Sequence, residues 1–152
     1  MTMQSSQFGQ ISLLNYWLPE VETKPPADVP DNVTSFYLQG TDNLARKHYD
    51  AAGTMFRKSL DTALKRLDPS GKGTLQQRID NLPAAVAITP AMKEWAHQIR
   101  ELGNDAAHDE DPFTEQEAST LQAFTELFLT YTFTLPGMVA ARKSPPPASP
   151  PP

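Results

Sequence analysis

Residues 114–135, with the sequence TEQEASTLQAFTELFLTYTFTL, decide which fold class this chain favours. Their apolar side chains recur at spacings of three and four residues, which places them on one face of an α-helix; they are Ala118, Leu121, Phe124, Phe128, Tyr131 and Leu135. Thr114 is a favoured N-cap residue, and Pro136 is expected to end the helix. From residue 121 onward the stretch also contains a glutamine, a glutamate and four threonines. It is therefore too polar for a membrane span of about 20 apolar residues and predicts a core helix.

The rest of the central chain shows the same helical period. Asp31 or Asn32 is expected to cap a first helix, which Gly40 weakens, and Thr89 followed by Pro90 marks another helix start. The predicted helices cover residues 33–44, 47–67, 75–82, 90–108 and 114–135. Because no segment alternates apolar and polar residues over a sustained stretch, the predicted fold class is all-α, a bundle of about four to five helices.

The 152 residues are enough for one domain of ordinary size, with distinct ends. Residues 1–29 combine prolines with aromatic and aliphatic side chains, so we expect an extended proline-rich arm that docks on the domain. Residues 30–140 form the predicted helical domain. Residues 141–152 end in Ser-Pro-Pro-Pro-Ala-Ser-Pro-Pro-Pro, which has little apolar area to bury and predicts a disordered tail.

The composition excludes several classes of protein. Because it has no cysteine, the chain has no disulfide, thiolate metal site or cysteine nucleophile, and we predict no metal or other cofactor. Its net charge of −5 argues against broad electrostatic adsorption to nucleic acid or to an anionic membrane, but permits a small basic site. No secretory signal is recognisable in the first residues. We therefore expect a soluble, cytoplasmic protein without a membrane partner.

A row of polar side chains runs along one edge of the helix predicted at residues 90–108. At about 100° per residue, these side chains fall within roughly 80° of arc; they are His97, Arg100, Asn104 and His108. An apolar stripe lies roughly 150° away and faces the core. His108 can shuttle a proton near neutral pH, Arg100 can hold a phosphate or carboxylate, and Asn104 can orient the histidine or bind a ribose. The row predicts a binding or catalytic site.

Each candidate also has a structural interpretation. The asparagine and the histidines of the row can cap neighbouring backbone, and Arg100 can pair with Glu94 or Glu101. Arg57 is a further candidate for ligand binding. It can form an i,i+4 ion pair with Asp61, or it can point across the bundle toward the polar row.

Two other motifs favour loops over sites. Gly71-Lys-Gly-Thr74 lacks the upstream glycine, the hydroxyl residue after lysine and the preceding strand that a phosphate-binding loop requires. We interpret it as a helix C-cap and a loop. His108-Asp-Glu-Asp111 is rich in oxygen ligands, but neighbouring residues at the end of a helix rarely converge on one ion. An acidic cap is therefore favoured over a metal site.

Several motifs follow one another along the chain: Tyr49-Asp-Ala-Ala52, Phe56-Arg-Lys-Ser-Leu60, Gly71-Lys-Gly-Thr-Leu75-Gln-Gln-Arg-Ile-Asp80, Ile88-Thr-Pro90, Trp95-Ala-His97, Ile99-Arg100, Gly103-Asn-Asp-Ala-Ala-His108 and Tyr131 with Leu135-Pro136. In this order they resemble a bacterial family, the domain of unknown function 4145. The likeness covers about residues 29–137, and the block at 103–108 is its most specific part. Family members often carry a cysteine-rich zinc ribbon or are fused to restriction enzymes, and this sequence shows neither.

That family is similar to the HEPN superfamily (higher eukaryote and prokaryote nucleotide-binding domains) of small helical bundles. Many HEPN members are toxin or defence ribonucleases that act as dimers. In these, an arginine, an adjacent polar residue and a histidine a few residues later face the same motif of the partner. The resemblance assigns His108 to the motif histidine and Asn104 to the polar residue. Gly103 stands in the place of the arginine, and Arg100 lies one turn earlier, which argues against full nuclease activity.

The sequence supports three functional hypotheses. The first is a non-catalytic or weakly active HEPN-like module of a phage-defence, toxin–antitoxin or restriction system, which binds a nucleotide, RNA or a protein partner through Arg57, His97, Arg100, Asn104 and His108. The second is a metal-independent ribonuclease toxin, with His108 as general base, Asn104 beside it and Arg100 on the phosphate. The third is a structural dimerisation or scaffold domain. A homodimer is expected in all three, from the resemblance and from the small residues Ala96, Gly103 and Ala107.

Overall fold

The computed structural model describes residues 24–86, 88–103 and 111–143. In chain order the helices are α2 (Asp31–Ala45), α3 (Tyr49–Leu67), α4 (Leu75–Asp80), α5 (Pro90–Gln98), α6 (Arg100–Gly103), α7 (Glu115–Leu129) and α8 (Leu135–Lys143), with a π-helical turn at Thr130–Thr134 between the last two. No strand occurs in these described ranges, which confirms the all-α fold class. None of their helices is both long and apolar enough to cross a membrane.

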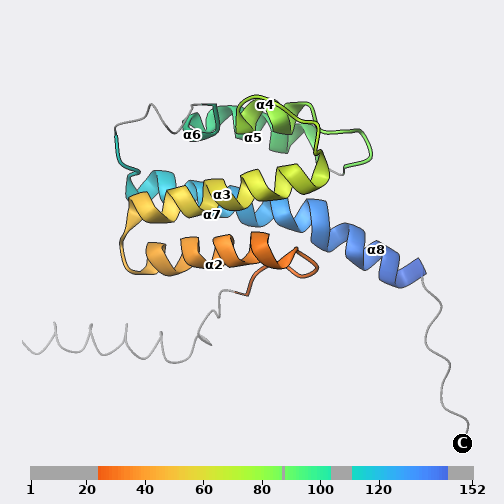
Figure 1. Ribbon diagram of the computed structural model, residues 1–152, viewed down its shortest axis with the longest axis horizontal. Helices are drawn as coiled ribbons and strands as arrows, with labels where there is room; N and C mark the ends of the chain where they lie inside the picture. Colours follow the sequence, from red (N-terminus) through yellow and green to blue (C-terminus); the bar gives the residue numbers. More distant parts are fainter. Residues whose placement is uncertain (1–23, 87, 104–110, 144–152) are drawn as a thin grey trace, which may run out of the picture.

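Three long helices form the body of the molecule. Helices α3 and α7 lie together, with α2 along one side of them and the short helices α4, α5 and α6 in a layer on the other side (Figure 1). Helix α8 continues from α7 beyond the bundle (Figure 1). The largest fully buried side chains come from all three long helices and include Tyr37, Phe56, Leu60, Phe124 and Phe128. Burial of these apolar side chains is the main source of stability.

Aromatic contacts connect the short helices to this body. The Trp95 ring of α5 meets the Phe124 ring of α7 edge to face, with 5.3 Å between their centroids. Phe124 in turn stacks on Phe128 at 6.0 Å. Both geometries are among those that aromatic pairs prefer. The layer of short helices is therefore anchored on α7 through one tryptophan.

Threonine caps begin two of the predicted helices where the sequence placed them. Thr114 Oγ1 accepts a hydrogen bond from the backbone N–H three residues later at 3.2 Å, and Thr89 Oγ1 does the same at 3.1 Å. The caps predicted at Asp31 or Asn32 are wrong. The cap position of α2 is Pro30, which makes no side-chain hydrogen bond, and Asp31 is the first helical residue. There its carboxylate complements the positive end of the helix dipole.

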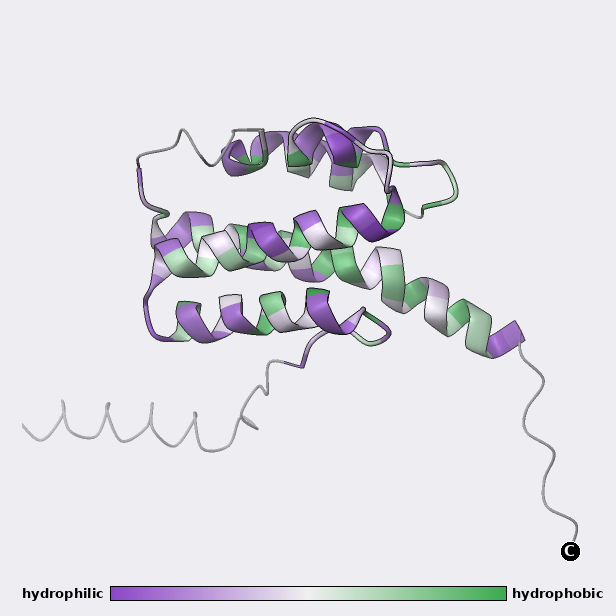
Figure 2. Ribbon diagram, in the orientation of Figure 1, coloured by the Kyte–Doolittle hydropathy of each residue, from purple (hydrophilic) through white to green (hydrophobic). Residues whose placement is uncertain are grey.

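Pro136 does not end the last helix, contrary to the sequence prediction. A proline has no N–H for the helix and its ring clashes with the carbonyl four residues earlier, but the preceding turn is π-helical. In that turn the Leu135 N–H bonds to the Thr130 carbonyl, five residues back, which widens the helix ahead of the proline. Helix α8 then runs to Lys143, three residues into the predicted tail, with hydrophobic residues beyond the bundle (Figure 2).

The helix predicted over residues 90–108 is divided, which is a second correction. Helix α5 ends at Gln98, Ile99 has an extended backbone (φ −88°, ψ 100°), and α6 restarts at Arg100. No glycine or proline lies at the break, so local propensity does not explain it. Instead Ile99 is 4% exposed and Leu102 is fully buried, so tertiary packing sets the new direction. With α7 and α8 counted as one helix, the described residues form six helices instead of four to five.

Gly40 allows α2 and α3 to approach closely. A Cβ atom at this position would lie 2.5 Å from the Phe56 ring, much closer than real contacts allow. We expect Gly40→Ala to lower the free energy of unfolding by about 1–3 kcal/mol through overpacking, although alanine is the better helix former. Urea unfolding measures this change, with Ser35→Ala at an exposed position of the same helix as the control. A more stable Gly40→Ala protein would contradict the close packing.

Candidate functional site

A cavity of about 630 Å³ lies between α3, the short helices and the start of α7. We call it the arginine cavity, because Arg57 of α3 and Arg100 of α6 both line it. Its other lining residues are Asp50, Thr54, Lys58, Asp61, Leu75, Glu101, Asp111, Pro112, Phe113, Thr114 and Glu117. Its volume is in the range of about 300–1,000 Å³ that is typical of small-molecule sites.

The structure brings together two of the residues predicted to bind a ligand. Arg57 was expected either to pair with Asp61 or to point across the bundle toward the polar row, and it lines the arginine cavity together with both Asp61 and Arg100. Both interpretations stay predictions. The carboxylate of Asp61 contacts Lys65 Nζ at 2.9 Å and Arg78 Nη1 at 2.6 Å.

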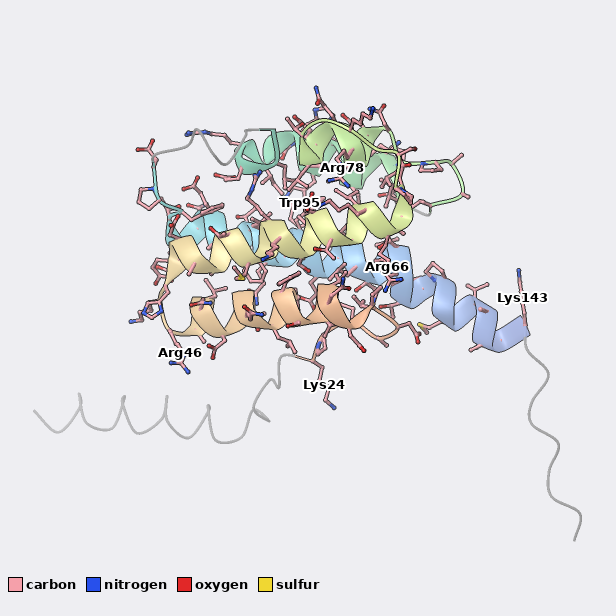
Figure 3. The ribbon with its side chains drawn as sticks, in the orientation of Figure 1. Lys24, Arg46, Arg66, Arg78, Trp95 and Lys143 are labelled. Atoms are coloured by element: carbon pink, nitrogen blue, oxygen red, sulfur yellow. The ribbon has the colours of Figure 1, made fainter. Side chains whose placement is uncertain are left out.

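Arg78 of α4 pairs with Asp61, which lines the cavity. Its side chain is 8% exposed and points toward the layer of α3 and α7, as does that of Trp95 (Figure 3). The Arg78 Nε has no hydrogen-bond partner among the described residues. Burial opposes ionisation of Asp61, but hydrogen bonds from Lys65 and Arg78 outweigh it and hold the pKa of Asp61 below its usual value. A buried cation thus depends on a carboxylate at the cavity surface.

Two carboxyl groups meet in the cavity wall. Burial, and then a hydrogen bond with Glu117, raise the pKa of Glu101. The same hydrogen bond, together with one from the Thr114 backbone N–H, lowers the pKa of Glu117. The pair connects α6 to the first turn of α7.

The loop before α7 is held on α3 by a side chain and a backbone bond. The Phe113 ring occupies the place where a Cβ of Gly53 would be, at a separation that only glycine allows. The Phe113 backbone N–H donates to Asp50 Oδ1 at 3.1 Å. These two contacts position Thr114 and Glu117 beside the arginines.

A second, smaller cavity of about 310 Å³ adjoins the first. We call it the tryptophan cavity, since Trp95 lines it together with Gln98, Ile99, Gln116 and Thr120. Its remaining lining residues, Arg100, Glu101, Thr114 and Glu117, also line the arginine cavity. The two cavities are therefore neighbours with a common wall.

His97 lies apart from both cavities, although it was predicted in one row with Arg100. Its Nε2 contacts Asp80 Oδ2 at 2.8 Å, and its Nδ1 lies 2.6 Å from Gln76 Nε2. Both ring nitrogens thus face α4, because α5 ends before Arg100. The polar row is broken at that point, and His97 connects two helices. The other members of the row, Asn104 and His108, lie outside the described residues, and their roles stay predictions.

The small residues of the divided helix pack within the chain. Ala96 is fully buried in the core, and a Cβ on Gly103 would lie 2.8 Å from Gln76 Oε1 of α4. These two residues therefore serve contacts between helices of one chain. The third, Ala107, lies outside the described residues.

Sequence reasoning missed the carboxyl pair and the role of Arg78. Glu117 carries a recognisable signal, because Thr114 and Glu117 form the capping box of α7. Glu101 and Arg78 carry none, since nothing local marks which charged residue of a short helix turns inward. Their burial is decided by the packing of α4 and α6 on α3 and α7.

Comparison with known families identifies the family of this chain. The family model described as Domain of unknown function (DUF4145) matches residues 42–144, most of the chain and all of the helices that line the two cavities. The protein belongs to this family of helical domains, as the order of its motifs indicated. A search of curated proteins and a search of solved structures each gave no match.

Comparison of Asp61→Asn with Lys65→Met separates the two ion pairs of Asp61. We expect Asp61→Asn to lower the free energy of unfolding by about 3 kcal/mol, the low end for a broken buried pair, since Asp61 is 37% exposed while Arg78 is buried. Lys65→Met, which removes only the exposed partner, should change it by about 0.5 kcal/mol or less. Chemical denaturation of both variants makes the comparison. Equal losses would show that Arg78 does not need Asp61.

The carboxyl pair predicts a pH-dependent stability. The pKa of Glu101 is higher in the folded than in the unfolded chain. The stability that follows is fully present at a pH below the pKa of the unfolded chain, and it is lost as the pH rises through the pKa of the folded protein. Glu101→Gln keeps a donor to Glu117 and removes this titration. We therefore expect the variant to gain stability relative to wild type between pH 5 and pH 8, as measured by urea unfolding. Exposed Glu94→Gln is the control, and a difference that does not depend on pH would contradict the raised pKa of Glu101.

Proposed function

We propose that this protein is a non-catalytic or weakly active binding module whose arginine cavity takes a phosphorylated nucleotide or the phosphorylated end of an RNA. The observation that carries the proposal is the presence of Arg57 and Arg100 in one cavity of suitable volume. Guanidinium groups bind phosphate oxygens through paired, charge-assisted hydrogen bonds. A single cavity lined by two of them, from separate helices, fits a phosphate better than a neutral ligand.

The acidic residues of the cavity are compatible with an anionic ligand because most of them have structural partners. Asp61 is bonded to two cations, and Glu101 is hydrogen-bonded to Glu117. Asp50 accepts the Phe113 backbone N–H, and Glu117 accepts that of Thr114. These carboxyl groups hold the wall together. In this proposal the ligand phosphate binds Arg57 and Arg100.

The proposal places binding ahead of catalysis. Gly103 stands where the HEPN arginine is expected, and the helix break moves His97 away from Arg100. General acid–base groups contribute about 10²–10⁴-fold, but a phosphate-stabilising cation in the wrong place costs comparable rate. Homodimer formation and a role in phage defence, toxin–antitoxin or restriction systems belong to the same proposal.

Titration with a phosphorylated ligand that has no base tests the anion site. We expect ribose 5-phosphate to bind wild type, and Arg57→Gln and Arg100→Gln each to weaken binding about tenfold or more, the effect of losing a hydrogen bond to a charged group. Arg46→Gln is the matched control, because Arg46 is an exposed arginine that pairs with Asp42 on α2. Binding can be followed by NMR titration. No binding, or equal affinity in all four proteins, would overturn the proposal.

Incubation with mixed RNA in EDTA separates binding from catalysis. We expect the RNA to remain intact with wild type and with His108→Ala. Cleavage by wild type alone, with 2′,3′-cyclic phosphate ends, would replace the binding module with the metal-independent ribonuclease. If the protein neither binds ribose 5-phosphate nor cleaves RNA, the result favours the structural scaffold hypothesis.

A further inference from the structure

We propose that the tryptophan cavity is a nucleobase subsite, in which Trp95 stacks on the base of a nucleotide whose phosphate lies in the arginine cavity. This inference rests on the proposed function and specifies its ligand as a nucleotide rather than any phosphorylated molecule. The common wall supports it. Arg100 and Glu101 line both cavities, so the two subsites of the proposed ligand are neighbours.

The tryptophan cavity fits a planar, uncharged group. Its lining residues that are not shared with the arginine cavity are Trp95, Gln98, Ile99, Gln116 and Thr120, and none of them carries a charge. The charged residues of this cavity, Arg100, Glu101 and Glu117, all lie in the wall that it shares with the arginine cavity. A nucleobase is flat and uncharged, so it suits this lining.

Trp95 is held in place to act as a stacking surface. The edge-to-face contact with the fully buried Phe124 fixes the indole, and Trp95 itself is only half-buried. A fixed aromatic ring with an accessible side loses little conformational freedom when a base stacks on it. Stacking accepts every base, since each has a π-face.

Hydrogen-bonding groups surround the indole. The amides of Gln98 and Gln116 each offer donors and an acceptor, and the Thr120 hydroxyl offers one of each. The edges of a nucleobase present donors and acceptors of the same kind. Amide groups can match either pattern by rotation, so the subsite holds a base in place without strict choice between bases.

The helix break brings the two parts of the site together. Gln98 is the last residue of α5 and Arg100 the first of α6, with the extended Ile99 between them. In a continuous helix, Trp95 and Arg100 would lie about 140° apart on the helix surface. The change of direction at Ile99 lets both residues face the start of α7.

Fluorescence and affinity of paired ligands test the subsite. The chain has two tryptophans, so Trp17→Phe leaves Trp95 as the reporter. We expect AMP to change the Trp95 emission and to bind at least tenfold more tightly than ribose 5-phosphate, which lacks the base. Trp95→Leu should reduce AMP affinity to that of ribose 5-phosphate and leave the affinity for ribose 5-phosphate unchanged.

A second variant keeps the test valid if Trp95→Leu unfolds. Gln116→Leu changes an exposed residue of α7 that lines only the tryptophan cavity, so it should keep the melting temperature and lower AMP affinity alone. Equal wild-type affinity for AMP and ribose 5-phosphate, or equal losses of both ligands in the variants, would overturn the base subsite while leaving the anion site. If wild type binds neither ligand, the proposed function and this inference both fail.

Discussion

The contact between Phe113 and Gly53 is the constraint on which the site depends. It seats the start of α7 on α3 at a separation that any side chain larger than hydrogen would prevent. The hydrogen bond from the Phe113 N–H to Asp50 fixes the same loop. From there the capping box directs Glu117 toward Glu101, and α6 is held against α7. The cavity exists because one ring, packed against one glycine, sets the spacing of three helices.

Charge in the site is arranged in pairs that serve both stability and chemistry. Burial of an arginine without a carboxylate partner lowers the stability of the fold, because the charge loses its hydration. Arg78 has such a partner in Asp61 at the cavity surface. Burial and the hydrogen bond with Glu117 raise the pKa of Glu101, while the same bond lowers the pKa of Glu117. These paired groups line the same cavity as Arg57 and Arg100.

The aromatic residues connect the core to the same site. Phe124 lies in the centre of α7, stacks on Phe128 and receives the edge of Trp95. Trp95 thus belongs both to the core and to the wall of a cavity. Helix α5 is anchored by this ring, and its end at Gln98 leaves Arg100 to begin a new helix beside it. The division of one predicted helix into two is accompanied by an indole and a guanidinium group that line one cavity.

The sequence by itself determined the fold class, the family and the starts of α4, α5 and α7. Apolar spacing of three and four residues, threonine N-caps and loop prolines act locally, so Thr89 and Thr114 could be assigned without tertiary information. The sequence also singled out Arg57 and Arg100. Only the tertiary structure decided that these two share a cavity, that His97 faces α4, and that the helix passes Pro136 through a π-helical turn. The helix break at the buried Ile99 and the burial of Glu101 and Arg78 depend on neighbours far along the chain. A local sequence pattern contains no information about those neighbours, so it could not predict these features.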